Sequence, residues 1–162
     1  MEIERKWLID SSNIPYDLSK LERCSIEQAY VSFSPVIRIR KINDGKRYLL
    51  TVKGDVPGSG HLVRREYELE ISSAQYASLM KKAEGNVINK TRYFHKRSDG
   101  LVEEIDLFEG SLDGLAYLEI EFEDEESARA FPSPEWTIAD VTEVKGFNNG
   151  ALARFGMPRL TV

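Results

Sequence analysis

Two stretches of opposite charge hold the residues of this sequence that could do chemistry. The segment 36–65 has eight Lys or Arg against two acids, a net charge of +6, whereas the segment 101–126 has eleven acids and no Lys or Arg. Guanidinium and ammonium groups bind phosphate oxygens, and carboxylates bind hard cations such as Mg²⁺ or Mn²⁺. One kind of ligand needs both sets of groups, a polyphosphate chelated to a divalent metal.

The charges recur at every second residue with apolar residues between them, which is the period of a β-strand. Arg38 and Arg40 flank Ile39, and Glu119 and Glu121 lie two residues apart. Two like charges about 6 Å apart at an effective dielectric near 20 repel by roughly 3 kcal/mol, so such rows cost stability unless opposite charges or a ligand compensate them. A sheet with one solvated face would explain any single strand. Same-sign pairs on several strands favour a charged face that binds a ligand, and this face could line the interior if the sheet closes into a barrel.

Turn residues separate the alternating stretches and predict hairpins in a mostly antiparallel sheet. The strands are expected near residues 2–6, 36–41, 48–54, 64–70, 89–95, 103–107 and 118–123. The clearest helix is expected over 73–84, because Ser72 and Gln75 make a capping box and Gly85 ends the apolar pattern. Shorter helices are expected at 16–23, 125–131 and 149–155, with their apolar residues covering the sheet. This is an α+β pattern in one domain, residues 1–162.

Composition excludes several classes of protein. The chain has 162 residues, 41% of them hydrophobic and 30% charged, as in a soluble globular domain. The single Cys24 cannot form an internal disulfide, and no apolar run reaches the ~18 residues of a membrane span, so we expect a cytoplasmic protein with no membrane partner. His61 and His95 are the only histidines, which excludes a zinc site of clustered Cys and His. We expect His61 in a surface loop and His95 at a strand end, and we expect no nucleic-acid partner because acids oppose the basic stretch.

An ordered series of motifs resembles the CYTH superfamily, the triphosphate tunnel metalloenzymes. The opening residues 2–6 match the ExExK signature of that superfamily, a signature common by chance. The motifs that follow in order span nearly the whole chain: QAYV at Gln28, VIRIR at Val36, LTVKG at Leu50, RREYELEI at Arg64, NKTRY at Asn89, EEIDLFEG at Glu103, LEIEFED at Leu118 and VTEVKGFNNGALA at Val141. The resemblance implies a closed eight-stranded antiparallel β-barrel with helices packed outside, and Mg²⁺ or Mn²⁺ as cofactor.

The resemblance also implies roles for individual residues. The metal-binding carboxylates would be Glu2, Glu4, Asp106, Glu119 and Glu121. The triphosphate-binding cations would be Lys6, Arg38, Arg40, Lys53, Arg64, Lys90 and Arg92. Tyr30 and Lys90 match the water-handling pair of short bacterial tripolyphosphatases, although a buried Tyr on a strand also serves packing. Glu66, Glu68 and Glu104 share the inward register and are expected at least as much to balance the cations.

The sequence departs from the family pattern near its C-terminus. Family members commonly carry an acid and a basic residue in a segment of the form VTxDxRYxN, and the corresponding residues here are Val144 and Gly146. Phe147 and Asn149 occupy the places of the aromatic residue and the Asn, and Lys145 could replace the missing cation. The contact that this segment makes with substrate or product in the family is therefore not predicted for this chain.

The predicted function is metal-dependent hydrolysis of triphosphates, with inorganic triphosphate as the leading substrate and a triphosphate-containing small molecule as the partner. A class IV adenylate cyclase that converts ATP to cyclic AMP and pyrophosphate is the first alternative, and it would need an adenine pocket. A thiamine triphosphatase is the second, for which Trp7 or Trp136 could supply an aromatic clamp. A non-catalytic polyphosphate-binding module is the third. The sequence leaves open whether the protein forms a homodimer.

Overall fold

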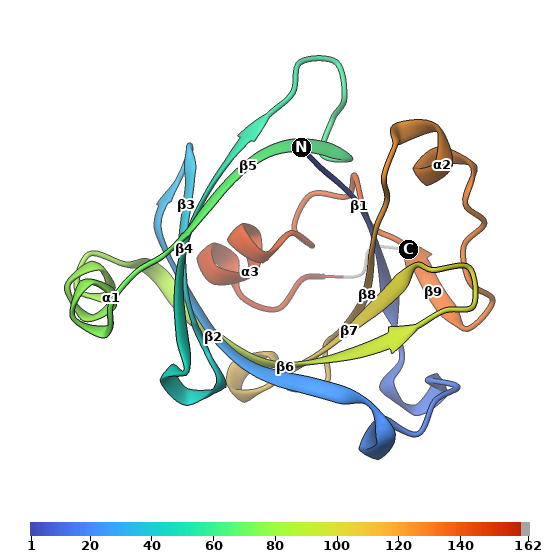
Figure 1. The fold of residues 1–162 in the computed structure, drawn as a ribbon, viewed down its shortest axis with the longest axis horizontal. Helices are drawn as coiled ribbons and strands as arrows, with labels where there is room; N and C mark the ends of the chain where they lie inside the picture. Colours follow the sequence, from blue (N-terminus) through green and yellow to red (C-terminus); the bar gives the residue numbers. More distant parts are fainter. Residues whose placement is uncertain (160–162) are drawn as a thin grey trace.

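The computed structural model describes residues 1–159, and among these residues nine strands form one antiparallel sheet. The strand order is β5-β4-β3-β2-β6-β7-β8-β1-β9, and β5 also pairs with β1, so eight strands close into a barrel while β9 lies beside β1. Figure 1 shows the strands as a ring around an interior. Their bounds are β1 Glu2–Ile9, β2 Glu22–Phe33, β3 Val36–Ile42, β4 Arg47–Asp55, β5 Val63–Glu70, β6 Glu84–Lys96, β7 Val102–Phe108, β8 Ala116–Glu121 and β9 Thr137–Asp140.

Alternate residues of each strand point out of the barrel, and most apolar ones are covered there, whereas Tyr67 and Leu69 of β5 are exposed. Ile39, Ile105 and Ile120 are fully buried on this outer face. Helix α1, Ser73–Met80, packs on β2 and β3, and helix α2, Glu125–Ala130, packs on β1. The predicted capping box of Ser72 and Gln75 is present at the start of α1. This helix ends at Met80, earlier than predicted, because β6 already begins at Glu84.

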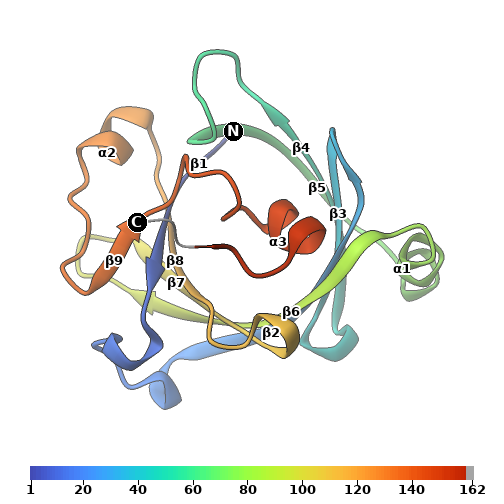
Figure 2. The same ribbon diagram turned by 180° about the vertical axis from the view of Figure 1, so that it is seen from behind.

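Helix α3, Asn149–Phe155, lies inside one end of the barrel, as Figures 1 and 2 show from opposite sides. The expectation that helices pack outside is therefore correct for α1 and α2 and wrong for α3. The physical reason is that this half of the interior is apolar: Leu152 of α3 is in one buried cluster with Leu8, Ile88 and Tyr117 of the strands. Burying Leu152 against these residues removes apolar surface from water on both sides of the contact.

The expected helix at 16–23 is also corrected. The segment 16–23 forms no α-helix, since a 3₁₀ turn occupies Leu18–Lys20 and β2 begins at Glu22. Its apolar residues instead cover the outer wall, where the Tyr16 ring packs edge-on against Trp136. Strands β2 and β9 are not among the stretches that the alternation predicts as strands. Among residues 1–159 no helix is long and apolar enough to cross a membrane. The cytoplasmic location stays a prediction.

Candidate active site

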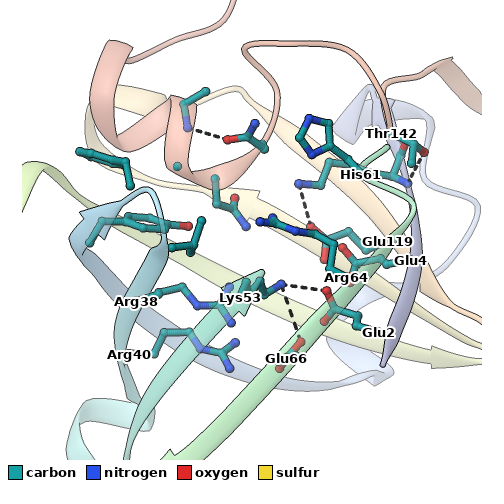
Figure 3. Close-up of a pocket in the computed structure, with 18 of the residues that line it drawn as sticks. Glu2, Glu4, Arg38, Arg40, Lys53, His61, Arg64, Glu66, Glu119 and Thr142 are labelled. Atoms are coloured by element: carbon teal, nitrogen blue, oxygen red, sulfur yellow. Dashed lines mark hydrogen bonds and ion pairs between the residues drawn. The ribbon is translucent and has the colours of Figure 1, made fainter. Parts of the chain in front are cut away.

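A cavity of about 560 Å³ occupies the polar half of the barrel interior (Figure 3). Most of the charged residues singled out in the sequence line it together: Glu2, Glu4, Lys6, Arg38, Arg40, Lys53, Arg64, Arg92, Glu119 and Glu121. Glu66, Glu68 and Glu104, expected to share this register, also line it, and Tyr30 does so from β2. Lys90 and Asp106 are the two predicted site residues that lie outside the lining. The alternation on several strands thus brings these side chains together around one cavity.

Antiparallel pairing sets the cations of β3 and β4 beside the acids of β5. Arg38 is paired across the ladder with Thr51, and Thr51 in turn with Glu68. The Glu68 carboxylate accepts hydrogen bonds from Arg40, at 2.6 Å, and from Thr51, at 2.9 Å. Lys53 Nζ lies 2.9 Å from a Glu2 oxygen and 3.8 Å from a Glu66 oxygen. The β5 acids therefore do balance cations, as expected.

Arg38 is the exception to this balance. Its side chain is buried, with 7% of the residue exposed, and its one hydrogen bond is a long contact of 3.5 Å to Thr51 Oγ1. Within the described part of the chain no carboxylate oxygen lies within 4.0 Å of its guanidinium. The Nε atoms of Arg38, Arg40 and Arg64 are also buried without a hydrogen-bond acceptor among residues 1–159, although Asp55 Oδ1 lies 3.4 Å from Arg64 Nε as an ion-pair partner. A buried cation without a partner is costly, so this wall of the cavity is built to receive an anion.

The opposite wall carries acids from β1 and β8. In the ladder Glu4 faces Glu121, and Lys6 faces Glu119. Burial raises the pKa of Glu4 well above its usual range, and the charges of Glu119 and Glu2 raise it further. Lys6 and Arg92 together overcome burial and lower the pKa of Glu119. This wall thus crowds negative charge beyond what its own cations neutralise.

The donor set fits a hard divalent cation that a ligand helps to hold. Buried Glu119 Oε1 accepts no hydrogen bond, and the nearest cation, Lys6 Nζ, is 3.5 Å away. Among residues 1–159 no three His, Cys, Asp or Glu side chains are arranged to hold a metal by themselves. Mg²⁺ is commonly bound by one or two carboxylates together with substrate phosphates, which matches carboxylates such as Glu4 and Glu119 facing the cation wall.

Lys90 and Asp106 form a buried ion pair behind the cavity lining. Lys90 Nζ donates to Asp106 Oδ2 at 2.8 Å, and Arg92 donates to both oxygens of the same carboxylate at 2.7 and 2.9 Å. Burial lowers the pKa of Lys90 to about 8, against the opposing charge of Asp106. Both Asp106 oxygens are thus occupied by protein donors. The role of Asp106 as a metal ligand stays a prediction, and any metal there would have to share Oδ1 with Arg92.

Tyr30 lies where the charged and apolar halves of the interior meet. It lines the cavity and also belongs to the buried cluster under α3. Its ring stacks on Phe33, with centroids 5.5 Å apart. The two tryptophans considered as clamps lie elsewhere: Trp7 is fully buried on the outer wall, where its Nε1 donates to Ser133 at 2.9 Å, and Trp136 packs in the same outer cluster.

The cavity contains residues that the sequence did not single out for it. His61 is exposed as expected of a loop residue, yet it also lines the cavity (Figure 3). Thr142 joins it, because its Oγ1 accepts a hydrogen bond from Lys6 N at 3.0 Å. The start of α3 adds Asn148 and also Asn149, which the sequence matches to the Asn of the family pattern, whereas the departing residues Val144 and Gly146 do not line the cavity. No alternation marks these loop residues, so only the fold could place them.

Comparison with known families decides the identity of this fold. The CYTH domain matches residues 1–133. The chain belongs to the CYTH domain family. It is 37% identical over 153 residues to the inorganic triphosphatase of Nitrosomonas europaea, covering 94% of this chain and 96% of that protein. It is 34% identical over 156 residues to the inorganic triphosphatase of Acetivibrio thermocellus, covering 94% and 93%.

A solved structure agrees with the family assignment. The crystal structure of the inorganic triphosphatase NE1496 is similar to this chain with a TM-score of 0.66 and 35% sequence identity, covering 94% of each chain. The closed barrel predicted from the sequence is thereby confirmed, with one extra strand and with α3 inside.

Proposed function

We propose that this CYTH protein is a metal-dependent triphosphatase that hydrolyses inorganic triphosphate to phosphate and pyrophosphate. The observation that carries the proposal is Arg38, a buried guanidinium with no carboxylate partner among the described residues, on a wall of cations that faces a wall of acids. Only an anion that also carries a metal satisfies both walls. The names of the two relatives above support the same substrate.

The cation wall would bind the triphosphate and stabilise it in the transition state. The Nε donors of Arg38 and Arg40 have no hydrogen-bond acceptor among the described residues, Arg64 Nε has only the 3.4 Å ion pair with Asp55, and Lys53 adds a point charge beside Glu2. Donors fixed in advance, in a site shielded from bulk water, stabilise the charge that develops on phosphoryl oxygens without having to reorganise. The chain of three phosphates would therefore lie along β3 and β4.

Glu2, Glu4, Glu119 and Glu121 would hold Mg²⁺ or Mn²⁺ against the triphosphate. When bound, the metal supplies positive charge to the phosphoryl oxygens. We leave Asp106 out of this set, because Lys90 and Arg92 occupy its oxygens. Its role is to hold Lys90 and Arg92 in place.

Tyr30 and Lys90 remain the candidates for handling the attacking water. Tyr30 reaches the cavity, and Lys90 lies behind the lining with its pKa lowered to about 8 by burial. A lysine with this pKa exchanges a proton near neutral pH, as a general base requires. Tyr30 would orient the water, and Lys90 would accept the proton from it.

The cavity gives no support to the other reactions considered. Trp7 and Trp136 lie on the outer wall and cannot clamp thiamine triphosphate. The aromatic residues of the lining are Tyr30, Phe33 and Phe155; the first two stack on each other and leave no gap between their rings for adenine, and Phe155 is 74% exposed at the end of α3 and forms no pocket with them. A metal-free polyphosphate-binding module has no use for the acidic wall.

One assay panel tests the proposal. Phosphate, pyrophosphate and cyclic AMP are measured from inorganic triphosphate, ATP and thiamine triphosphate, each with Mg²⁺, with Mn²⁺ and with a chelator. We expect one phosphate and one pyrophosphate from each inorganic triphosphate, only when metal is present. Formation of cyclic AMP would favour the cyclase, faster cleavage of thiamine triphosphate would favour that substrate, and binding without any turnover would favour the module.

A further inference from the structure

The barrel closes across a short seam between β1 and β5. Only two residue pairs join these strands, Glu2 with Arg64 and Ile3 with Val63, whereas β1 and β8 share five pairs. One more backbone hydrogen bond extends the seam, from Glu4 N to Leu62 O at 3.1 Å. The seam matters to the site, because Glu2, Glu4 and Arg64 all line the cavity.

Glu143, outside the cavity lining, braces this seam. Its carboxylate accepts hydrogen bonds from His61 N, at 3.1 Å to Oε1 and 2.9 Å to Oε2, and from Leu62 N, at 3.0 Å to Oε1. Hydrogen bonds to an ionised acceptor are about twice as strong as neutral ones. The loop between β4 and β5 is thus held at the residues that enter β5 just before Arg64.

Gly60 is shaped to this contact. Its φ of +57° is one that glycine adopts most readily, and a Cβ there would lie 2.6 Å from Glu143 Oε2. Gly58, in the same loop and also at positive φ, has nothing within 4 Å of its Cβ position. Glycine is therefore required at position 60 by the nearby Glu143 carboxylate as well as by the turn.

The segment that carries Glu143 is itself fixed to β1. Val141 N donates to Lys6 O at 2.9 Å, and Lys6 N donates to Thr142 Oγ1 at 3.0 Å. Glu143, two residues after Val141, contacts the β4–β5 loop. The chain then reaches α3 through buried Phe147. One short segment therefore connects β1, the β4–β5 loop and the helix inside the barrel.

We propose that Glu143 is a positioning residue that sets Arg64 and His61 against the triphosphate by tying the β4–β5 loop across the barrel seam. The proposal rests on the proposed function of the cavity. Glu143 does not line the cavity, so its effect must pass through the backbone of His61 and Leu62 to the side chains that do. A displacement of about 1 Å in such groups can cost up to a hundredfold in rate.

The test measures kcat and KM for inorganic triphosphate with saturating Mg²⁺ in the wild type, Glu143→Ala, Arg64→Ala and the double variant. We expect Glu143→Ala to raise KM on the order of tenfold to a hundredfold. The same substitution should have less effect in the Arg64→Ala background, because one of the two side chains that it positions is gone. Glu126→Gln on the exposed face of α2 is the matched control and should leave both constants unchanged.

Hydrogen exchange supplies the second readout. The amides of His61 and Leu62 should exchange faster in Glu143→Ala, since their acceptor is lost. Should that variant fail to fold, Glu143→Gln, which keeps the size but loses the charge, takes its place with a smaller rise in KM. Additive effects of Glu143→Ala and Arg64→Ala would contradict the positioning role of Glu143. An unchanged KM together with unchanged amide exchange in Glu143→Ala would contradict it as well. A wild type that releases no phosphate would instead show that the proposed function is wrong, and the positioning role would fall with it.

Discussion

The two halves of the barrel interior are formed by the same strands, yet one half is a core and the other is a charged cavity. On β1, Glu4 and Lys6 line the cavity, whereas Leu8, the next inward residue, packs in the buried cluster under α3. On β8, Glu119 lines the cavity, and Tyr117 lies in that cluster. The period of a strand fixes which residues point inward, and their identity decides which half stabilises the fold and which half binds.

The two halves also differ in what they contribute to stability. Burial of Leu152 against the strands is favourable by itself. The charged half collects Arg38, Arg40 and Arg92 near one another, and burial together with the charges of the other two lowers the pKa of Arg40 to about 10. Sites of this kind commonly cost stability in return for function. Substitutions in the two halves should therefore separate stability from turnover.

The largest expected effect is on stability, in the apolar half. Leu152→Ala should lower the free energy of unfolding by about 2 to 5 kcal/mol, since it removes a fully buried leucine and leaves a cavity. Urea denaturation followed by circular dichroism measures this change. Phe155→Ala on the same helix, where the ring is 74% exposed, is the control and should stay within about 0.5 kcal/mol. A loss below about 1 kcal/mol for Leu152→Ala would contradict the placement of α3 inside the barrel.

The next effect is on turnover, in the charged half. Arg40→Ala and Lys53→Ala should each lower kcat/KM for inorganic triphosphate by an amount worth about 2 to 4 kcal/mol, by analogy with the loss of one oxyanion donor. Folding should survive, but each substitution leaves an acid without its ion-pair partner, Glu68 for Arg40→Ala and Glu2 for Lys53→Ala, so stability should fall. Steady-state phosphate release measures the effect, with Arg47→Ala and Lys82→Ala as exposed controls outside the lining. Equal losses in the controls would mean that net charge, and not the cavity, governs the rate.

The smallest effect concerns pH, at the border of the two halves. Since burial lowers the pKa of Lys90 to about 8, neutral Lys90 becomes more abundant as pH rises, and kcat should increase about tenfold per pH unit below 8. Unfolded lysine keeps its proton up to about pH 10.4, so Lys90 should also make the protein more stable as pH rises from about 8 to 10. A kcat profile of the wild type and Lys90→Gln tests the role. The same rising limb in both proteins would remove Lys90 from catalysis.

Much of the fold could be predicted from local patterns. The alternation around Ile39 and Ile120 marked strands with one charged face, and Ser72 with Gln75 marked the start of α1. The side of the sheet on which α3 packs could not be predicted, because Leu152 and Ala153 would suit either face. The place of α3 follows from the apolar inward residues at one end of the barrel, which become visible only once the strands are in register.

The candidate site was predictable where it lies on strands and not where it lies on loops. Arg38 and Glu119 follow the alternation and were placed on the inward face from the sequence. Thr142 and Glu143 belong to a segment without a regular period, and their contacts with Lys6 and His61 join residues more than 80 positions apart. His61 was expected at the surface, and its exposure agrees, but its position on the cavity rim depends on that long-range contact.

The most direct test of the central claim is the Mg²⁺ dependence of triphosphate hydrolysis in Glu119→Gln and Arg40→Ala, measured side by side with the wild type. Loss of a carboxylate should weaken metal binding, so Glu119→Gln should need more Mg²⁺ and recover part of its activity at high concentration. Arg40→Ala should keep the wild-type Mg²⁺ midpoint and reach a lower plateau that no excess metal raises. Identical Mg²⁺ curves for the two variants, or full turnover in both, would contradict the division of the cavity into a metal wall and a phosphate wall.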